Sequence, residues 1–136
     1  MSFLLDTCVL SEGVKSTADD AVIRWIRSTP EKDQFTSAIA VAELKFGIEV
    51  MTQGRRRTQL DDWFRETLRP SLGDRVIPFD ESCAMVWASL RVRSPNAKFA
   101  DGQIAATTLA HGLTLVTRNV RDFAFAGLPV FNPWSK

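Results

Sequence analysis

Four acidic residues of the sequence occupy positions where a carboxylate can take part in catalysis. Asp6 ends the apolar run SFLL, and Glu43 lies inside the apolar segment SAIAVAELKFGIEVM. Asp101 opens the segment DGQIAATTLAHG, and Asp122 follows the apolar run LTLVT by a few residues. Grouped carboxylates repel one another unless a cation neutralises them, and hard cations such as Mg²⁺ and Mn²⁺ prefer oxygen ligands. The pattern therefore predicts a metal site whose activated water hydrolyses phosphodiester bonds.

Glu43 carries the most weight in this prediction. A helix over residues 37–51 places it on an apolar stripe, with Ile39, Ala40, Phe46 and Gly47 one turn away. Burial of an isolated carboxylate costs on the order of several kcal/mol. We therefore expect Glu43 to be buried and to be paired, protonated or bound to a cation.

The other three acids also have purely structural interpretations. Asp101 could act as a helix cap, because aspartate is common at that position. Asp122 could cap a turn or pair with Arg118 or Arg121, and Asp6 could begin a turn after its strand. The sequence leaves both kinds of interpretation open for each residue.

The elements that must position these acids alternate between strands and helices. We expect strands at residues 2–5, 34–37, 75–79, 113–117 and 129–132. We expect helices at residues 16–28, with Ser16 or Thr17 as the cap, and at 37–51, 54–70, 81–93 and 101–112. This alternation is typical of an α/β domain with a mainly parallel sheet. Ligands of such sheets bind beyond the carboxyl ends of the strands, where Asp6 lies.

Composition restricts the class of protein. The 136 residues fit one domain, and the net charge of +1 means that any nucleic-acid contact must use a local basic patch. Cys8 and Cys83 are far apart and form no metal-ligand spacing, which predicts free thiols in a reducing compartment and argues against zinc. No leader or apolar run of membrane-spanning length is present, so we expect a cytoplasmic protein without membrane contact.

Several polar residues lie near the predicted site in the sequence. The candidates for contacts with an RNA backbone are Arg91, Arg93, Lys98, Arg118 and Arg121. Thr117 and Asn119 could hydrogen-bond a ligand carboxylate, or could simply form a turn. His111 ends a helix, where contact with the helix dipole is the simplest interpretation.

Four motifs in this order resemble the PIN-domain ribonucleases, specifically the VapC-type toxins of the FitB-like branch. They are FLLDTCVLSE, SAIAVAELKFGIE, ADGQIAATTLAHGLTLVTRNVRDF and the closing NPW, and together they span nearly the whole chain. The resemblance implies a PIN-like three-layer domain over residues 1–136, with a central, mainly parallel β-sheet flanked by helices. It also implies a Mg²⁺-dependent endoribonuclease whose catalytic and metal-binding acids match Asp6, Glu43, Asp101 and Asp122.

The same resemblance implies partners. The chain would be the toxin of a type II toxin–antitoxin system, and a VapB-like antitoxin would insert a C-terminal segment into its groove and bind promoter DNA at its other end. Members of this family are usually homodimers, and larger toxin–antitoxin complexes on DNA are also expected. Two alternatives stay open: a protein-binding module whose acidic groove receives a basic antitoxin tail, and a metal-dependent DNA nuclease or phosphatase.

The chain departs from the family pattern at two positions. The family usually has asparagine where this chain has Cys8, and a thiol is a weaker hydrogen-bonding group than an amide, so we expect weaker support for the site. Gly102 stands where alanine is common, which predicts a looser first helical turn by somewhat under about 1 kcal/mol. Neither departure removes a predicted metal ligand.

Overall fold

A five-stranded parallel sheet forms the centre of the computed structural model, which describes residues 1–134. The strand order is β3-β2-β1-β4-β5, and all four strand pairings are parallel. The strands are β1 (Phe3–Leu5), β2 (Gln34–Ser37), β3 (Val76–Ile77), β4 (Thr114–Val116) and β5 (Val130–Phe131). Each falls within a predicted segment, so the predicted parallel α/β fold is confirmed.

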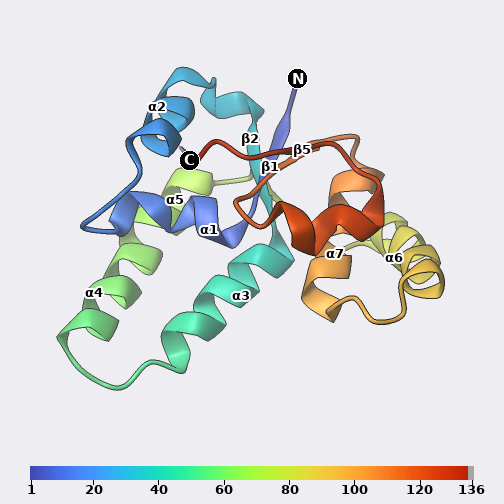
Figure 1. Ribbon diagram of the computed structural model, residues 1–136. Coiled ribbons are helices and arrows are strands. Elements are labelled where there is room, and N and C mark those ends of the chain that lie inside the picture. The colour runs from blue at the N-terminus through green and yellow to red at the C-terminus, as the bar shows by residue number, and fades with distance from the viewer. Residues whose placement is uncertain (135–136) are drawn as a thin grey trace.

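Helices cover both faces of this sheet. They are α1 (Thr7–Leu10), α2 (Asp20–Ser28), α3 (Ala38–Glu49), α4 (Arg55–Trp63), α5 (Arg69–Leu72), α6 (Glu81–Arg93) and α7 (Phe99–Ala110). In Figure 1 the sheet runs between α1, α2, α4 and α5 on the left and α6 and α7 on the right, which is the predicted three-layer arrangement. No helix in residues 1–134 has both the length and the apolar run that a bilayer crossing requires.

The order of the strands creates a crevice at one edge of the sheet. From β1 the chain builds β2 and β3 on one side, and it later adds β4 and β5 on the other. Leu5 pairs with Val116 across β1 and β4, and the Asp6 amide donates to the Val116 carbonyl at 3.0 Å. Asp6 and Thr117 therefore leave adjacent strands side by side, at the point where parallel sheets bind ligands.

The apolar core packs the strands β1 and β4 against the long helix α7. Leu4, Leu115, Ala105 and Ala106 are completely buried and belong to one apolar cluster. Full burial of a leucine side chain contributes about 1.5–3 kcal/mol. Because α7 also packs on α3 and α6, its first turn, which contains Asp101, is held against the carboxyl edge of the sheet.

Two predicted helix starts are wrong by a few residues. Helix α2 begins at Asp20 instead of near Ser16, because the Asp19 carboxylate accepts hydrogen bonds from the amides of Ala21 (2.9 Å) and Val22 (3.3 Å). Helix α7 begins at Phe99, two residues before the predicted start. Asp101 therefore lies within the first turn and does not cap the helix.

The predicted end of the helix at Pro70 is also wrong. After α4 the chain continues through a π-helical turn (Phe64–Leu68) into α5, which ends at Leu72. The Arg69 amide donates to the Phe64 carbonyl, five residues earlier. A proline ring in a regular helix clashes with the carbonyl four residues before it, and the wider turn lets the helix pass through Pro70.

Candidate active site

Asp6 is buried at the carboxyl edge of the sheet, and both of its carboxylate oxygens accept hydrogen bonds. Its side chain is 4% exposed, and its Oδ1 accepts hydrogen bonds from the Thr7 amide (2.8 Å) and the Thr7 hydroxyl (3.2 Å). Its Oδ2 accepts from the Thr117 hydroxyl at 2.8 Å. Asp6 therefore caps α1 and is also fixed from β4, so the structural and functional interpretations hold together. Thr7, which the sequence analysis did not single out, is recognisable only as the residue next to Asp6.

Thr117 connects the two central strands through this hydrogen bond. It is completely buried, and its Oγ1 also accepts from the Asn119 amide at 3.1 Å. The Asn119 backbone thus orients the hydroxyl that donates to Asp6. Thr117 therefore hydrogen-bonds a candidate ligand carboxylate and also forms the turn to Asn119, so both interpretations of the segment TRN describe it.

Cys8 occupies the position where the related family usually has asparagine. Its sulfur lies 3.9 Å from Asp6 Oδ2 and 3.6 Å from Thr117 Oγ1, and it accepts from the Arg118 amide at 3.5 Å. Burial raises the pKa of the thiol, and the Asp6 charge adds to the rise, while the Arg118 amide opposes it. The raised pKa favours the protonated thiol, which connects Asp6, Thr117 and the Arg118 amide through long, weak contacts.

The pKa of Asp101 responds to the charges of the other three acids. It is half-buried in the first turn of α7. Burial raises its pKa, and the negative charges of Asp122 and Asp6 raise it further, with a smaller contribution from Glu43. The Lys98 ammonium partly offsets this rise. The fold thus brings Asp6, Asp122 and Glu43 within electrostatic range of Asp101.

The prediction that Glu43 is buried is wrong. Glu43 is exposed, and so are Phe46 (62%) and Val50 (63%) on the same side of α3, whereas Ala40 and Ile48 are buried. Helix α3 carries apolar side chains on several faces, so periodicity alone selected the wrong face as the core. The candidate role of Glu43 therefore rests on its electrostatic contact with Asp101 and on the family resemblance, not on burial.

Asp122 is exposed within the 3₁₀ segment Val120–Ala126 that follows β4. Its amide donates to the Asn119 carbonyl at 3.0 Å, which places the turn against the end of the strand. Among residues 1–134 it forms no ion pair with Arg118 or Arg121, so the predicted alternative of pairing with them is wrong.

The donor set fits a hydrated hard cation. All four side chains offer carboxylate oxygens, and a cation between them would relieve the repulsion that raises the pKa of Asp101. Within the described chain, no three of these acids bring one oxygen each within 4.8 Å of one another. Mg²⁺ usually keeps several waters, which span such gaps, so the arrangement suits Mg²⁺ or Mn²⁺ better than a tightly caged ion.

The five basic residues that were predicted to contact RNA differ in the interactions that they make. The Arg91 guanidinium lies near two aromatic rings that pack edge-on against each other, 5.0 Å from the centroid of Trp87 and 4.8 Å from that of Phe99. The Arg118 guanidinium lies 5.8 Å from the Trp134 ring. Arg93, Lys98 and Arg121 are exposed. Among the described residues, two of these five interact with the site. The Lys98 ammonium acts on the Asp101 carboxylate through its charge, and the Arg118 backbone amide donates to the Cys8 sulfur.

An open groove of about 360 Å³ begins beside the acids. Thr7 and Glu43 line its end nearest Asp6, and Ile48, Leu60 and Trp63 line the rest, from α1, α3 and α4. Leu60 and Trp63 are half-buried, and they pack against the apolar core as well as line this groove. An apolar groove beside an acidic site is suited to a peptide segment.

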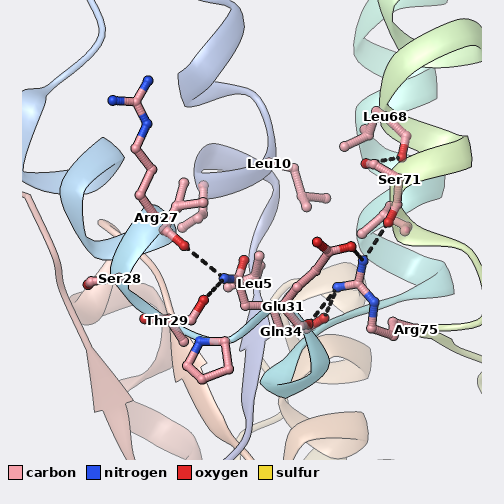
Figure 2. Close-up of a pocket in the computed structure, with 14 residues that line it drawn as sticks. Leu5, Leu10, Arg27, Ser28, Thr29, Glu31, Gln34, Leu68, Ser71 and Arg75 are labelled. Carbon is pink, nitrogen blue, oxygen red and sulfur yellow. Dashed lines mark hydrogen bonds and ion pairs between the residues drawn. The ribbon is translucent and has the colours of Figure 1, made fainter.

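Figure 2 shows a second cavity, of about 580 Å³, between α1, α2 and α5. Its polar groups bond one another: Arg75 donates to the carbonyls of Glu31 (2.9 Å), Gln34 (2.7 Å) and Ser71, and Gln34 donates to the carbonyl of Thr29 at 2.8 Å. These bonds tie α2, β2 and α5 together. The described lining contains no grouped acids, so the candidate active site stays with Asp6 and Asp101.

Known proteins resemble this chain over nearly its whole length. The family model described as PIN domain matches residues 3–127. Toxin FitB of Neisseria gonorrhoeae is 36% identical over 96% of this chain and 97% of its own length. A VapC ribonuclease of Sinorhizobium fredii is 40% identical over 96% of each chain.

Solved structures agree with these relatives. The structure of FitAcB from Neisseria gonorrhoeae superimposes with a TM-score of 0.89 at 36% identity, covering 98% of this chain and 99% of that one. FitAB bound to a DNA fragment gives a TM-score of 0.88 at 34% identity, covering 98% of this chain and 96% of that one. Both superpositions cover nearly the whole of this chain and agree with the fold described above.

Proposed function

The chain belongs to the PIN-domain family, and from that premise we propose that it is a Mg²⁺-dependent endoribonuclease that acts in the cytoplasm as the toxin of a type II toxin–antitoxin system. This proposal depends on one observation: at the carboxyl edge of the sheet, the negative charges of Asp122, Asp6 and Glu43 act on Asp101 and add to the rise that burial causes in its pKa. A bound cation would relieve this repulsion between the carboxylates.

The residues have distinct proposed roles. Asp6 and Asp101 hold Mg²⁺, or Mn²⁺ in its place, and Glu43 and Asp122 complete the ligand set. Thr117 and Thr7 keep the Asp6 carboxylate in one orientation through the bonds to its two oxygens. When bound, the metal would lower the pKa of a water and offset negative charge on the scissile phosphate.

RNA contacts come from local positive charge, because the net charge of the chain is only +1. Lys98 and Arg118 adjoin the acids and are proposed to bind the phosphates on either side of the cleavage site. Arg91, Arg93 and Arg121 extend this set. Because phosphate contacts carry no sequence information, we expect base preference to come from the shape of the crevice.

A VapB-like antitoxin is the proposed partner. The relatives described as FitAcB and FitAB are complexes, and FitAB is bound to DNA. In this chain the groove along α3 and α4 leads to Glu43, and Phe46 and Val50 expose apolar surface on the same helix. We propose that an antitoxin segment covers this surface and that a homodimer, alone or within a larger complex on DNA, is the working assembly.

The test is cleavage of a mixed pool of transfer and ribosomal RNA fragments in Mg²⁺, Mn²⁺ and EDTA. We expect metal-dependent cleavage that falls at least about 1,000-fold in Asp101→Asn, because a metal ion supplies several kcal/mol of transition-state stabilisation. The matched control is Asp62→Asn. Asp62 is an exposed aspartate on α4, away from Asp101 on α7, and it pairs with Arg65.

Three results would redirect the proposal. Equal cleavage by Asp101→Asn and the parent would remove this acid from the site. Metal-dependent cleavage of DNA or of phosphomonoesters, but not of RNA, would favour the nuclease or phosphatase alternative. Partner binding that depends on the acids, without hydrolysis in any metal, would favour the binding module.

A further inference from the structure

A second group of possible metal ligands lies away from the four acids. Asp80, Cys83 and His111 each place one donor atom (a carboxylate oxygen, the thiol sulfur and an imidazole nitrogen) within 4.8 Å of the other two. It is the one such group of three in residues 1–134. The nuclease proposal gives these residues no role.

The hairpin of α6 and α7 brings the three residues together. Asp80 is the N-cap of α6, and Cys83 follows one turn later. His111 is the C-cap of α7, and the chain turns away at Gly112, whose φ of 64° is the left-handed conformation that favours glycine. The two helices pack on each other and are joined by residues 94–98, so the first turn of α6 meets the last turn of α7 (Figure 1).

We propose that Asp80, Cys83 and His111 form a zinc site. One oxygen, one sulfur and one nitrogen donor make the mixed set that Zn²⁺ accepts in tetrahedral geometry. Mg²⁺ and Mn²⁺ prefer oxygen alone, so they do not compete well for this set. Three protein ligands leave a fourth position, which a water molecule fills.

The neighbouring groups already orient two of the ligands. Asp80 Oδ1 accepts from the Ser82 hydroxyl at 2.8 Å and from the Cys83 amide at 3.2 Å, so Oδ2 is the carboxylate oxygen left for an ion in the described chain. The Cys83 thiol is completely buried, where it makes a long hydrogen bond to the Pro78 carbonyl at 3.8 Å and also interacts with the Asp80 carboxylate. Binding replaces these weak contacts with a zinc–sulfur bond and releases the thiol proton to water.

The exposure of the ligands provides a route for the ion. Asp80 and His111 are exposed while Cys83 is buried beneath them, so zinc can enter from solvent and reach the sulfur last. Asp101 lies ten residues before His111 on α7, which corresponds to roughly 15 Å at 1.5 Å per residue. The zinc site is therefore separate from the acids and would join α6 to α7 at the far end of the helix that carries Asp101.

The test uses the full chain, stripped of metal and dialysed against Zn²⁺ with excess Mg²⁺ to occupy the acidic site. We expect one zinc ion per chain, and Co²⁺ in its place should show a thiolate-to-cobalt charge-transfer band. Cys83→Ser and His111→Gln should each weaken zinc binding at least about 100-fold, and Ser82→Ala about 10-fold, the smaller effect typical of a group that orients a ligand.

Matched controls distinguish this site from other positions. Cys8→Ser tests the other thiol and should keep the cobalt band, and Glu81→Gln tests an exposed acid of the same helical turn. If Cys83→Ser fails to fold, His111→Gln decides, since its side chain is exposed. The proposal is overturned if the parent binds no zinc in excess Mg²⁺, or if the cobalt band is lost with Cys8 and kept without Cys83.

Discussion

Two hydroxyl–carboxylate pairs of equal length lie in the two regions that we assign to metals. Thr117 donates to Asp6 at 2.8 Å, and Ser82 donates to Asp80 at 2.8 Å. The first pair is buried and the second is exposed. Asp6 receives bonds on both oxygens, whereas Asp80 receives Ser82 and the Cys83 amide on the same oxygen. The same bond thus fixes a whole carboxylate in one region and leaves an oxygen free in the other.

The surrounding charges differ in the same way. At the carboxyl edge of the sheet the ligands are all acids, and their repulsion raises the pKa of Asp101. At the end of α6 and α7 a single acid faces a thiol and an imidazole, and the pKa of Asp80 falls to about 2, chiefly because of the Ser82 hydroxyl. The first region is unfavourable until a cation neutralises it, and the second is already favourable without one.

The largest effect in this comparison should come from the buried pair. Thr117→Val removes the hydroxyl with little change in shape, and we expect RNA cleavage in Mg²⁺ to fall roughly 10–100-fold, as for other groups that orient a metal ligand. Zinc binding at Asp80 should not change. Thr117→Ser restores the hydroxyl and should recover most of the rate, whereas loss of rate in both variants would indicate a packing defect instead.

A smaller effect concerns stability without metal. Because the folded protein raises the pKa of Asp101, ionising this group destabilises the fold, and the penalty appears as the pH rises above 3.8 and is complete above the raised pKa. In EDTA at neutral pH, Asp101→Asn should therefore melt at a higher temperature than the parent.

The two proteins should converge below pH 3.8, and Mg²⁺ should narrow the difference by stabilising the parent more. Thermal melts over this pH range measure both trends. A lower melting temperature for Asp101→Asn at neutral pH would mean that mutual repulsion does not dominate at this carboxylate.

The smallest effect belongs to the exposed pair. In Ser82→Ala the pKa of Asp80 should rise from about 2 toward 3.8, because the hydroxyl is the largest cause of its depression. An acid with a depressed pKa stabilises the fold above its unfolded value, and this contribution disappears as the pH falls through about 2 in the parent. Carboxyl-carbon NMR titration of Asp80 measures the shift, and an unchanged titration would assign the depression to the Cys83 amide.

The fold was predictable because local and global signals agree. Short apolar runs at residues 2–5 and 113–117 became the strands β1 and β4, which pair with each other in the sheet. The errors came from local competition that no pattern reveals. Asp19 outcompeted Ser16 as a cap, and a wide turn carried the helix beyond Pro70.

The candidate site was only partly predictable. Asp6 and Asp101 were identified from strand ends and a helix start, which the parallel sheet brings together at one edge. Glu43 was identified for the wrong reason, since the apolar residues on its own side of the helix, Phe46 and Val50, are exposed and do not form a core. A single sequence does not distinguish an apolar side chain that is exposed, as Phe46 is, from one that is buried in a core.

The group of Asp80, Cys83 and His111 escaped prediction for a different reason. The argument against zinc considered only the spacing of the two cysteines, and His111 is 28 residues from Cys83 along the chain. Their contact depends on how α6 packs against α7 and on where each helix ends. Such information appears only when the helices have been placed relative to each other.

The π-helical turn before Pro70 makes the chain sensitive to length at that point. A turn of this kind is equivalent to one residue inserted into a regular helix. Because the wide turn takes up this extra residue locally, the segments before and after it keep nearly the rotation that a continuous regular helix would give them. Leu60 and Trp63 can therefore line the groove that ends at Glu43 while Leu68 and Leu72 are buried further along the same helical run. Deletion of one residue between Trp63 and Pro70 would leave this orientation nearly unchanged, but it would place Pro70 in a regular helix, where its ring clashes with the carbonyl four residues before it.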